Sequence, residues 1–125
     1  PLLVACHKGE NDVACALIDA GANTNSVNWK GMTPLMWACS NGNLKMMESL
    51  LQAEADPNFQ NLFPGNTALQ MASLNGHFEC VQRLLKAGSL VGLVTKTQVT
   101  AAHFAVKNGH VSILQLLITA KNFLL

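Results

Sequence analysis

The sequence predicts an all-α fold: a solenoid of stacked helix-turn-helix units joined by hairpin loops. Glycines recur at intervals of 33, 34 and 33 residues, at Gly9, Gly42, Gly76 and Gly109. Threonines keep the last two intervals, at Thr33, Thr67 and Thr100. Self-similarity with this period is typical of repeat proteins, in which each unit is too small to bury its apolar face alone. We therefore expect one repeat domain over residues 1–125 that offers a surface rather than a catalytic pocket.

The first unit covers approximately residues 1–27 and is partial. It begins at Pro1 and Leu2, in the middle of the repeating motif, so the hairpin that opens the later units is missing. Its second helix carries a leucine that recurs in every unit, as Leu17, Leu50, Leu84 and Leu117.

The second unit, residues 28–60, carries the repeat most clearly. Thr33 is a preferred N-cap, and Pro34 suits the first turn of a helix, where its missing N–H would have no partner. This helix is expected to end at Asn41-Gly42, because glycine permits a left-handed turn. A second helix from about Leu44 to Ala53 follows, with apolar residues at the i, i+3, i+4 spacing of one buried stripe.

The third and fourth units, residues 61–94 and 95–125, depart from that pattern. The period stretches to 34 in the third unit because residues 61–65 hold one extra residue at the hairpin tip. In the fourth unit, Gln98 replaces the turn glycine and Ala101 replaces the helix-opening proline. These losses remove turn chemistry and side-chain hydrogen bonds, so we expect the junction between units three and four to be the loosest part of the stack.

Five stretches share one register with the pattern G-x-T-P-L-H-x-A-A-x-x-G-H-x-x-V-V-x-L-L-L-x-x-G-A-D-V-N. They are Gly31-Met32-Thr33-Pro34-Leu35, Asn75-Gly76-His77, Asn108-Gly109-His110, Gly21-Ala22-Asn23-Thr24-Asn25 and Ala55-Asp56-Pro57-Asn58. Through them the chain resembles the ankyrin repeat family over essentially its whole length. The resemblance implies a non-catalytic protein–protein interaction module that binds a protein or peptide through hairpin tips and a concave face formed by the first helices.

The resemblance also implies roles for single loop residues. Asp56 occupies a family loop position and is expected to cap backbone N–H groups. Asn25 and Asn58 occupy the position at which an asparaginyl hydroxylase modifies some ankyrin repeats, although Thr24 and Pro57 precede them where the family usually has an aliphatic residue.

No constellation of residues indicates catalysis, a cofactor or a metal ion. His77 and His110 occupy the Gly-His position, where the resemblance implies that the ring ties helix to loop. His103 lies at the helix-opening position, and His7 is expected in solvent. The seven carboxylates are scattered, and there is no Gly-rich phosphate loop or Gly-flanked nucleophile. We predict that the segment is not an enzyme.

The four cysteines are interpreted as packing residues. Cys6 and Cys39 share a small buried position, Cys80 takes an apolar position, and Cys15 falls on the outer face. No pair has the spacing of zinc ligands. Free thiols favour a reducing compartment, so we expect the cytoplasm or the nucleus. No apolar run approaches the ~18–20 residues that span a bilayer, so membrane insertion is not expected.

Partner-binding residues are predicted at the hairpin tips and on the first helices. At the tips they are Trp29, Lys30, Met32, Leu62, Phe63, Asn66, Lys96 and Val99, and on the first helices they are Leu74 and Lys107. Trp29 and Phe63 are the candidate anchors, because a fully covered aromatic ring contributes roughly 3–5 kcal/mol. Alternatively, both rings fold back onto neighbouring loops. Trp37 shares an apolar position with Val4, Met71 and Phe104, and we expect it in the core.

Charge is divided unevenly along a chain whose net charge is +1. Residues 1–79 carry three lysines and seven acids, whereas the remaining residues carry five basic side chains and no acid. Three interpretations stay open: an acidic partner segment near units three and four, head-to-tail contact with an acidic repeat, and sequence drift. Nucleic acid is not expected, because the basic groups are few and lie on different faces.

Neither end of the chain has the polar face of a capping repeat. Residues 118–125 are mostly apolar, so either the next repeat of a longer array covers them or the uncapped ends bind a partner or self-associate. Two alternative functions follow: a regulatory or targeting segment of a larger enzyme, ubiquitin-ligase adaptor or ion channel, and a purely structural spacer.

Overall fold

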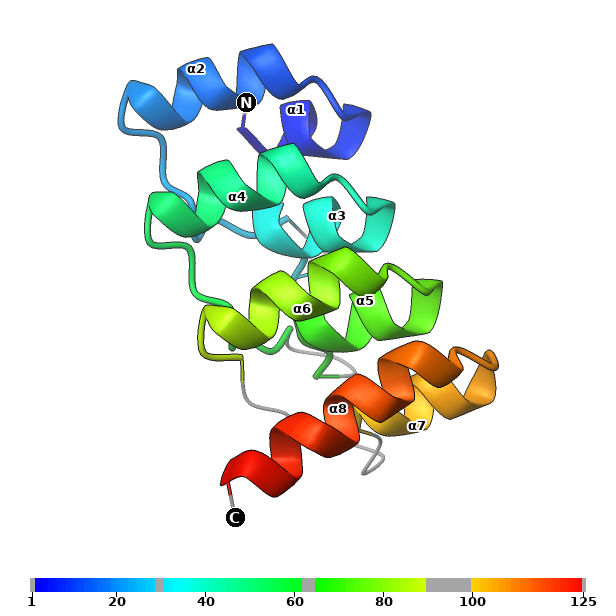
Figure 1. Ribbon diagram of the computed structural model, residues 1–125. Helices are drawn as coiled ribbons and strands as arrows, with labels where there is room; N and C mark the ends of the chain where they lie inside the picture. The colour runs from blue at the N-terminus through cyan, green and yellow to red at the C-terminus, as the bar shows by residue number, and fades with distance from the viewer. Residues whose placement is uncertain (1, 29–30, 62–64, 90–99, 125) are drawn as a thin grey trace.

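The computed structural model describes residues 2–28, 31–61, 65–89 and 100–124, with the backbone alone at residues 7 and 121–124. Within these residues there are eight α-helices in four pairs and no strand (Figure 1). The helices are α1 (Leu2–Lys8), α2 (Asn11–Asp19), α3 (Pro34–Asn41), α4 (Leu44–Gln52), α5 (Ala68–Asn75), α6 (Phe78–Lys86), α7 (Ala101–Lys107) and α8 (Val111–Leu124). The predicted all-α fold is confirmed.

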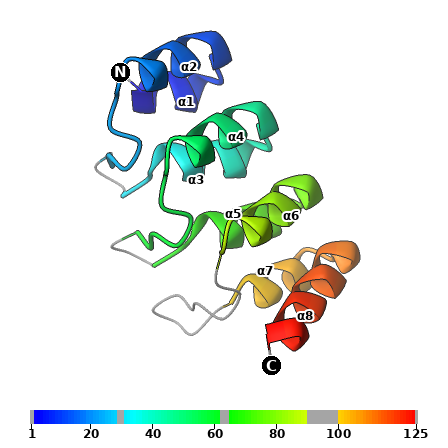
Figure 2. The same cartoon turned by 60° about the vertical axis from the view of Figure 1, so that its left-hand side comes forward.

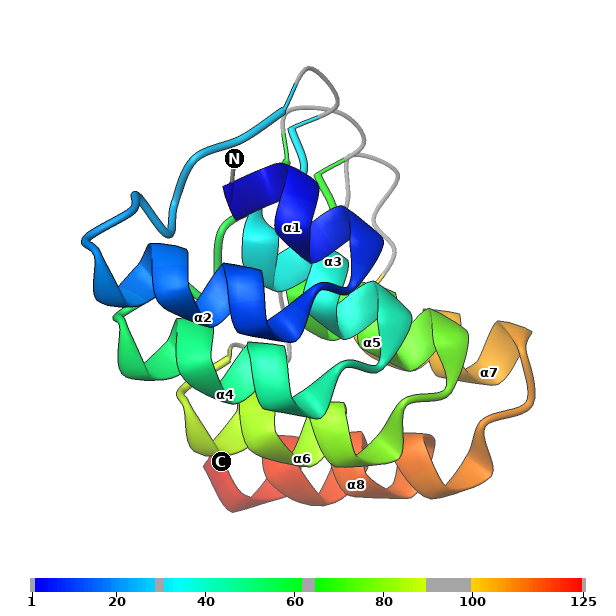
Figure 3. The ribbon, with the colours of Figure 1, turned by 90° about the horizontal axis from the view of Figure 1, so that it is seen from above.

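The helices form two layers. The first helices of the pairs stack in the order α1, α3, α5 and α7, and the second helices stack as α2, α4, α6 and α8. The tight turns within pairs lie at one edge of the stack, and the described residues that follow α2 and α4 lie at the other (Figures 1 and 3). Figure 2 shows the connections that follow α2 and α4 leaving the stack on the same side. Equivalent residues of successive pairs therefore lie next to one another, and we call each such set a slot.

The boundaries of α3 follow from its sequence. The Thr33 hydroxyl oxygen accepts the N–H of Met36 at 3.1 Å, as an N-cap does, and Pro34 is in the first turn. At the other end, Gly42 adopts the left-handed conformation, with a φ of 69°. Both ends agree with the prediction, and α4 ends one residue before the predicted Ala53.

Two later first helices open with a reciprocal capping box. Thr67 caps α5 together with Gln70, and Thr100 caps α7 together with His103. The Nδ1 atom of His103 accepts the N–H of Thr100 at 3.0 Å. His103 therefore has the helix-opening role expected for it.

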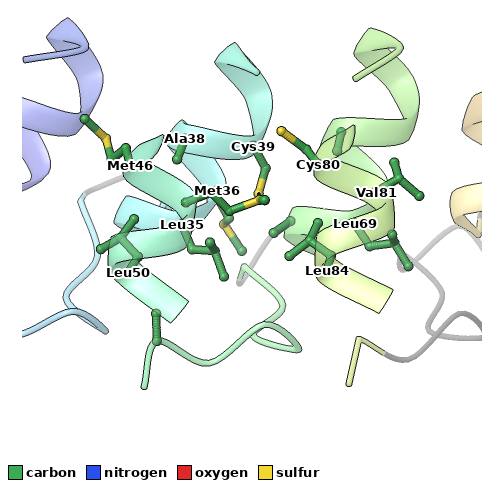
Figure 4. Close-up of a cluster of buried hydrophobic side chains, with 14 of the residues drawn as sticks. Leu35, Met36, Ala38, Cys39, Met46, Leu50, Leu69, Cys80, Val81 and Leu84 are labelled. Atoms are coloured by element: carbon green, nitrogen blue, oxygen red, sulfur yellow. The ribbon is translucent and has the colours of Figure 1, made fainter. Parts of the chain in front are cut away.

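The core lies between successive pairs. Figure 4 shows Leu35 and Leu50 of one pair and Leu69 and Leu84 of the next filling the space between the helices, and each is at most 1% exposed. Burial of this kind supplies most of the stability of a short helix pair.

One slot shows that each pair depends on its neighbour for burial. Met46, Cys80 and Ile113 are 0–2% exposed, whereas Val13 in the same slot is 48% exposed. The later three are covered by the preceding pair, and Val13 is on the first pair that the structure describes. The units therefore stack as the repeat period predicts.

Two asparagines close the connections that precede α3 and α5. The N–H of Asn28 donates to the carbonyl of Met32, and the N–H of Asn61 donates to the carbonyl of Asn66. The second connection is one residue longer, which agrees with the extra residue predicted for this hairpin. The junction predicted to be loosest depends on residues 90–99, which lie outside the described residues.

Candidate partner-binding face

Each first helix keeps one side open to solvent. In α3 most residues are buried, but Trp37 and Ser40 are partly buried and Asn41 is exposed. Their i, i+3, i+4 spacing places them on one side of the helix. The same pattern holds in α5 for Met71, Leu74 and Asn75. We call this side of α1, α3, α5 and α7 the first-helix face.

An apolar row runs along the first-helix face. The apolar row is the slot occupied by Val4, Trp37, Met71 and Phe104. Val4 is 55% exposed, and Trp37 and Met71 are partly buried with one side packed against the core. Trp37 was expected in the core, and the structure places it at the edge of the core, partly buried and packed against it. The apolar character of Trp37 does not show whether its side chain is fully buried or only lies against the core. The rotation of α3 about its axis determines this.

Hydrogen bonds between successive pairs hold the first helices in register. Asn75 Nδ2 donates to the carbonyl of Ser40 at 2.9 Å, and His77 Nε2 lies 3.0 Å from the same oxygen. One junction further on, Asn108 Nδ2 donates to the carbonyl of Leu74 at 2.6 Å, and His110 Nε2 lies 3.1 Å from it. These carbonyls are at the ends of α3 and α5, where helix geometry leaves them without an internal donor.

The turn glycines leave room for these histidines. A Cβ atom on Gly42 would lie 2.7 Å from the His77 ring, and one on Gly76 would lie 2.6 Å from the His110 ring. The resemblance implied that the rings of His77 and His110 tie helix to loop, and both rings do join two parts of the chain. The resemblance did not reveal that the acceptor belongs to the preceding pair.

A second set of hydrogen bonds joins the connections to one another. Asn25 Oδ1 accepts the N–H of Asp56 at 2.9 Å, and Asn58 Nδ2 donates to the carbonyl of Gly88 at 3.2 Å. Asp56 Oδ1 accepts the N–H of Asn58 at 2.9 Å, so the capping role predicted for this carboxylate is confirmed.

The structure describes four of the ten predicted binding residues. Lys107 is exposed and Leu74 is partly buried, and both lie on the first-helix face. Met32 is partly buried and packs against the core, so it supports the base of its loop instead of projecting from the tip. Asn66 is partly buried, and its N–H and carbonyl both pair with Asn61. Six predictions lie outside the described residues: Trp29, Lys30, Leu62, Phe63, Lys96 and Val99.

Charged side chains pair across the second helices. Arg83 Nε lies 2.6 Å from Glu48 Oε1, which joins α6 to α4. Lys45 Nζ lies 4.0 Å from the fully exposed carboxylate of Asp12, and this pair contributes little. Arg83 is therefore engaged within the fold, whereas Lys107 is exposed on the first-helix face.

Three of the four cysteines are buried as the sequence predicted, whereas Cys15, predicted on the outer face, lies against the next helix pair. Cys6, Cys39 and Cys80 are buried, and Cys15 is partly buried with its Sγ 3.3 Å from Ser49 Oγ. Burial raises the pKa of the Cys6 thiol to about 11, and it also raises the pKa values of Cys39 and Cys80. Thiols held in the protonated form are poor nucleophiles and poor metal ligands.

The described residues offer neither a metal cluster nor a membrane-spanning helix. In this part of the chain no three His, Cys, Asp or Glu side chains come together as a metal site would require. Over the same residues, none of the helices has both the length and the apolar character needed to cross a bilayer.

Comparison with known proteins identifies the repeat. A family model described as "Ankyrin repeats (3 copies)" matches residues 1–61 and 45–123. The chain is 32% identical to the E3 ubiquitin-protein ligase XBAT33 of Arabidopsis thaliana, over 94% of its own length and 28% of that protein. It is 32% identical to the ankyrin repeat and SOCS box protein 2 of Bos taurus, over 78% of its length and 16% of the relative.

A third relative matches a shorter part of the chain. The ankyrin repeat and SAM domain-containing protein 6 of Rattus norvegicus is 40% identical over 63% of the chain and 9% of the relative. In all three comparisons the chain spans less than a third of the relative's length.

Proposed function

Because the chain belongs to the ankyrin repeat family, whose repeats are non-catalytic modules that bind proteins, we propose that the first-helix face is its partner-binding surface. The observation that carries this proposal is the apolar row, which crosses all four pairs and keeps apolar surface in solvent. Covering about 200 Å² of such surface contributes roughly 5 kcal/mol before the costs of association.

Trp37 is the proposed anchor of this surface. It is partly buried, so its ring is already held in place, and the part that remains exposed can be covered by a partner. Large aromatic residues held in this way dominate many interfaces. Trp29 and Phe63 remain predicted anchors at the loop tips.

The proposed partner carries an acidic group near the third and fourth pairs. Lys107 supports this, because it is exposed on the first-helix face next to the apolar row, and Lys96 is predicted to add to it. Replacing Lys107 with Gln should slow association several-fold at low salt, and raising the salt concentration should slow the wild type toward the variant. Association rates that do not depend on salt would exclude the acidic group.

The binding face can be tested with a peptide library selected on the wild-type chain. Met71→Glu places a charge in the middle of the apolar row. Val111→Glu is the matched control, because Val111 is 62% exposed at the start of α8, outside the first-helix face. Selected peptides should bind Met71→Glu at least about tenfold more weakly and Val111→Glu with unchanged affinity. Equal weakening by both substitutions would place the binding surface elsewhere.

A second candidate function is recruitment of a target protein within a larger ubiquitin ligase. Four of the relatives are named as E3 ubiquitin-protein ligases or probable ones. In that case the full-length polypeptide should transfer ubiquitin to a partner bound by this segment. Met71→Glu should stop that transfer and leave ubiquitination of the polypeptide itself intact. A full-length protein without ubiquitin transfer would exclude this function.

Two further parts of the proposal concern location and self-association. The buried free thiols support residence in the cytoplasm or nucleus. Val13 and Val106 are exposed at opposite ends of the stack, and contact between copies at these ends is the alternative to coverage by neighbouring repeats. Sedimentation at increasing protein concentration tests that contact, and a constant monomer mass would exclude it.

A further inference from the structure

The turns within the last three pairs share the dipeptide Asn-Gly. It occurs as Asn41-Gly42, Asn75-Gly76 and Asn108-Gly109. Asn-Gly is especially prone to deamidation, because glycine has no side chain to hinder attack by its own backbone nitrogen on the asparagine. The three dipeptides are identical, so a large difference between their rates of deamidation must come from the fold.

Deamidation of Asn-Gly needs water and no enzyme, cofactor or oxidant. The glycine nitrogen attacks Cγ of the asparagine, a new C–N bond forms, and the Cγ–Nδ2 bond breaks as ammonia leaves with the proton of the glycine N–H. Water then opens the succinimide ring at either carbonyl and leaves aspartate or isoaspartate. The side-chain amide must therefore be free to turn toward the chain before the ring can close.

Two of the three side-chain amides are held by the preceding pair. Asn75 Nδ2 donates to the carbonyl of Ser40 at 2.9 Å and lies 3.2 Å from the Ser40 hydroxyl oxygen. Asn108 Nδ2 donates to the carbonyl of Leu74 at 2.6 Å. The nitrogen that leaves in the reaction is the atom that holds each amide in place, so these hydrogen bonds must open first.

The side chain of Asn41 is exposed and makes no hydrogen bond to the residues that the structure describes. The turn that follows it otherwise matches the turn after Asn75. Gly42 and Gly76 are both left-handed, with φ values of 69° and 77°, and the N–H of each bonds to a carbonyl of the helix that it ends. A histidine ring of the following pair lies against both glycines. The hydrogen bonds of the side chain are therefore the main difference between the two sites.

We propose that Asn41 is a site of spontaneous deamidation, and that the hydrogen bonds between pairs protect Asn75 and Asn108 from the same reaction. Asn41 lies one helical turn after Trp37 on the first-helix face. The reaction therefore adds a negative charge beside the apolar row, at the end of α3 that the helix dipole makes unfavourable for an anion. Its effect on partner binding, unlike the reaction itself, rests on the proposed function.

The test follows the three sites within one chain. The folded chain is incubated at pH 8.5 and digested, and the conversion of each asparagine to aspartate or isoaspartate is measured by mass spectrometry of the separated peptides. The same incubation in urea gives the three rates without the fold. Asn41→Gln is the control variant, because glutamine closes the corresponding larger ring much more slowly.

In the folded chain Asn41 should be converted at least about tenfold faster than Asn75 and Asn108, whereas in urea the three rates should agree within about twofold. Equal rates in the folded chain, or faster conversion of Asn75 or Asn108, would overturn the proposal. Conversion of Asn41 in urea alone would overturn it as well.

The effect on binding is measured with a peptide that binds the fresh wild-type chain and not Met71→Glu. After incubation the wild type should lose affinity in proportion to conversion of Asn41, and Asn41→Gln should keep its affinity, because the new charge repels an acidic partner. Unchanged affinity despite conversion would overturn this effect. Failure to find any peptide that depends on Met71 would count against the proposed function and not against the reaction.

Discussion

At the residue scale, the turn within a pair needs glycine for two reasons: a left-handed backbone and space for the histidine ring of the next pair. Gly76 has a φ of 77°, which disfavours any residue with a Cβ atom. It also lies against the His110 ring, whose Nε2 is 3.1 Å from the carbonyl of Leu74. Backbone conformation and the junction between pairs therefore depend on the same residue.

Substitution of two glycines separates these requirements. Gly109→Ala should cost about 1 kcal/mol, because only the left-handed backbone is strained. Gly76→Ala should cost about 2–3 kcal/mol, because the added Cβ also displaces the His110 ring and its hydrogen bond. Urea unfolding measures both, and equal losses would mean that the ring moves aside without cost.

The buried thiols predict a dependence of stability on alkaline pH. The pKa of Cys6 is raised to about 11 in the folded state from an ordinary value of 9.0. Its contribution is therefore complete below pH 9 and is lost as the pH rises toward 11, by up to about 1.4 kcal/mol per pH unit. Urea unfolding at pH 8.5 and pH 10.5 should show a smaller loss for Cys6→Ala than for the wild type, and identical losses would contradict this.

At the element scale, the junctions between pairs differ in strength. Asn75 and His77 join α5 and α6 to the end of α3, and Asn108 and His110 repeat this one pair later. In the second pair Asn43 replaces the histidine and bonds instead to the side chain of Asn11 at 2.6 Å. Among the described residues no Asn–His tie joins the second pair to the first, so the first pair is expected to open first.

Asn41 and Asn75 form a matched pair for testing this difference. They share a slot and both are exposed, but only Asn75 is bonded to another pair in the part of the chain that the structure describes. Asn75→Ala should lower the free energy of unfolding by about 1 kcal/mol, and Asn41→Ala should leave it nearly unchanged. Similar losses for both would show that the slot itself, and not the hydrogen bond, determines stability.

The helices could be predicted from the sequence because their signals are local. Thr33 and Gly42 mark the ends of α3 through caps that need only neighbouring residues. The exposure of Trp37 could not be predicted in this way, since it depends on how α3 is rotated against α1 and α5. The same holds for the acceptor of His77, which belongs to a residue 37 positions earlier in the sequence.

At the scale of the whole molecule, stacking joins the open sides of the four first helices into one continuous surface. Each pair buries its apolar residues against the next, and each first helix leaves one side open. The apolar row and Lys107 lie together only because four pairs repeat with one register. The proposed partner binding would therefore be a property of the whole stack and not of any single pair.

The methionine methyl groups test binding at the first-helix face most directly, because methionines lie in both helix layers. Met71 belongs to the apolar row, whereas Met46 and Met47 are fully buried in α4 of the second layer. When the chain is titrated with a peptide selected on it, the NMR signal of the Met71 methyl should shift while those of Met46 and Met47 stay in place. Shifts at Met46 and Met47 with none at Met71 would contradict binding at the first-helix face.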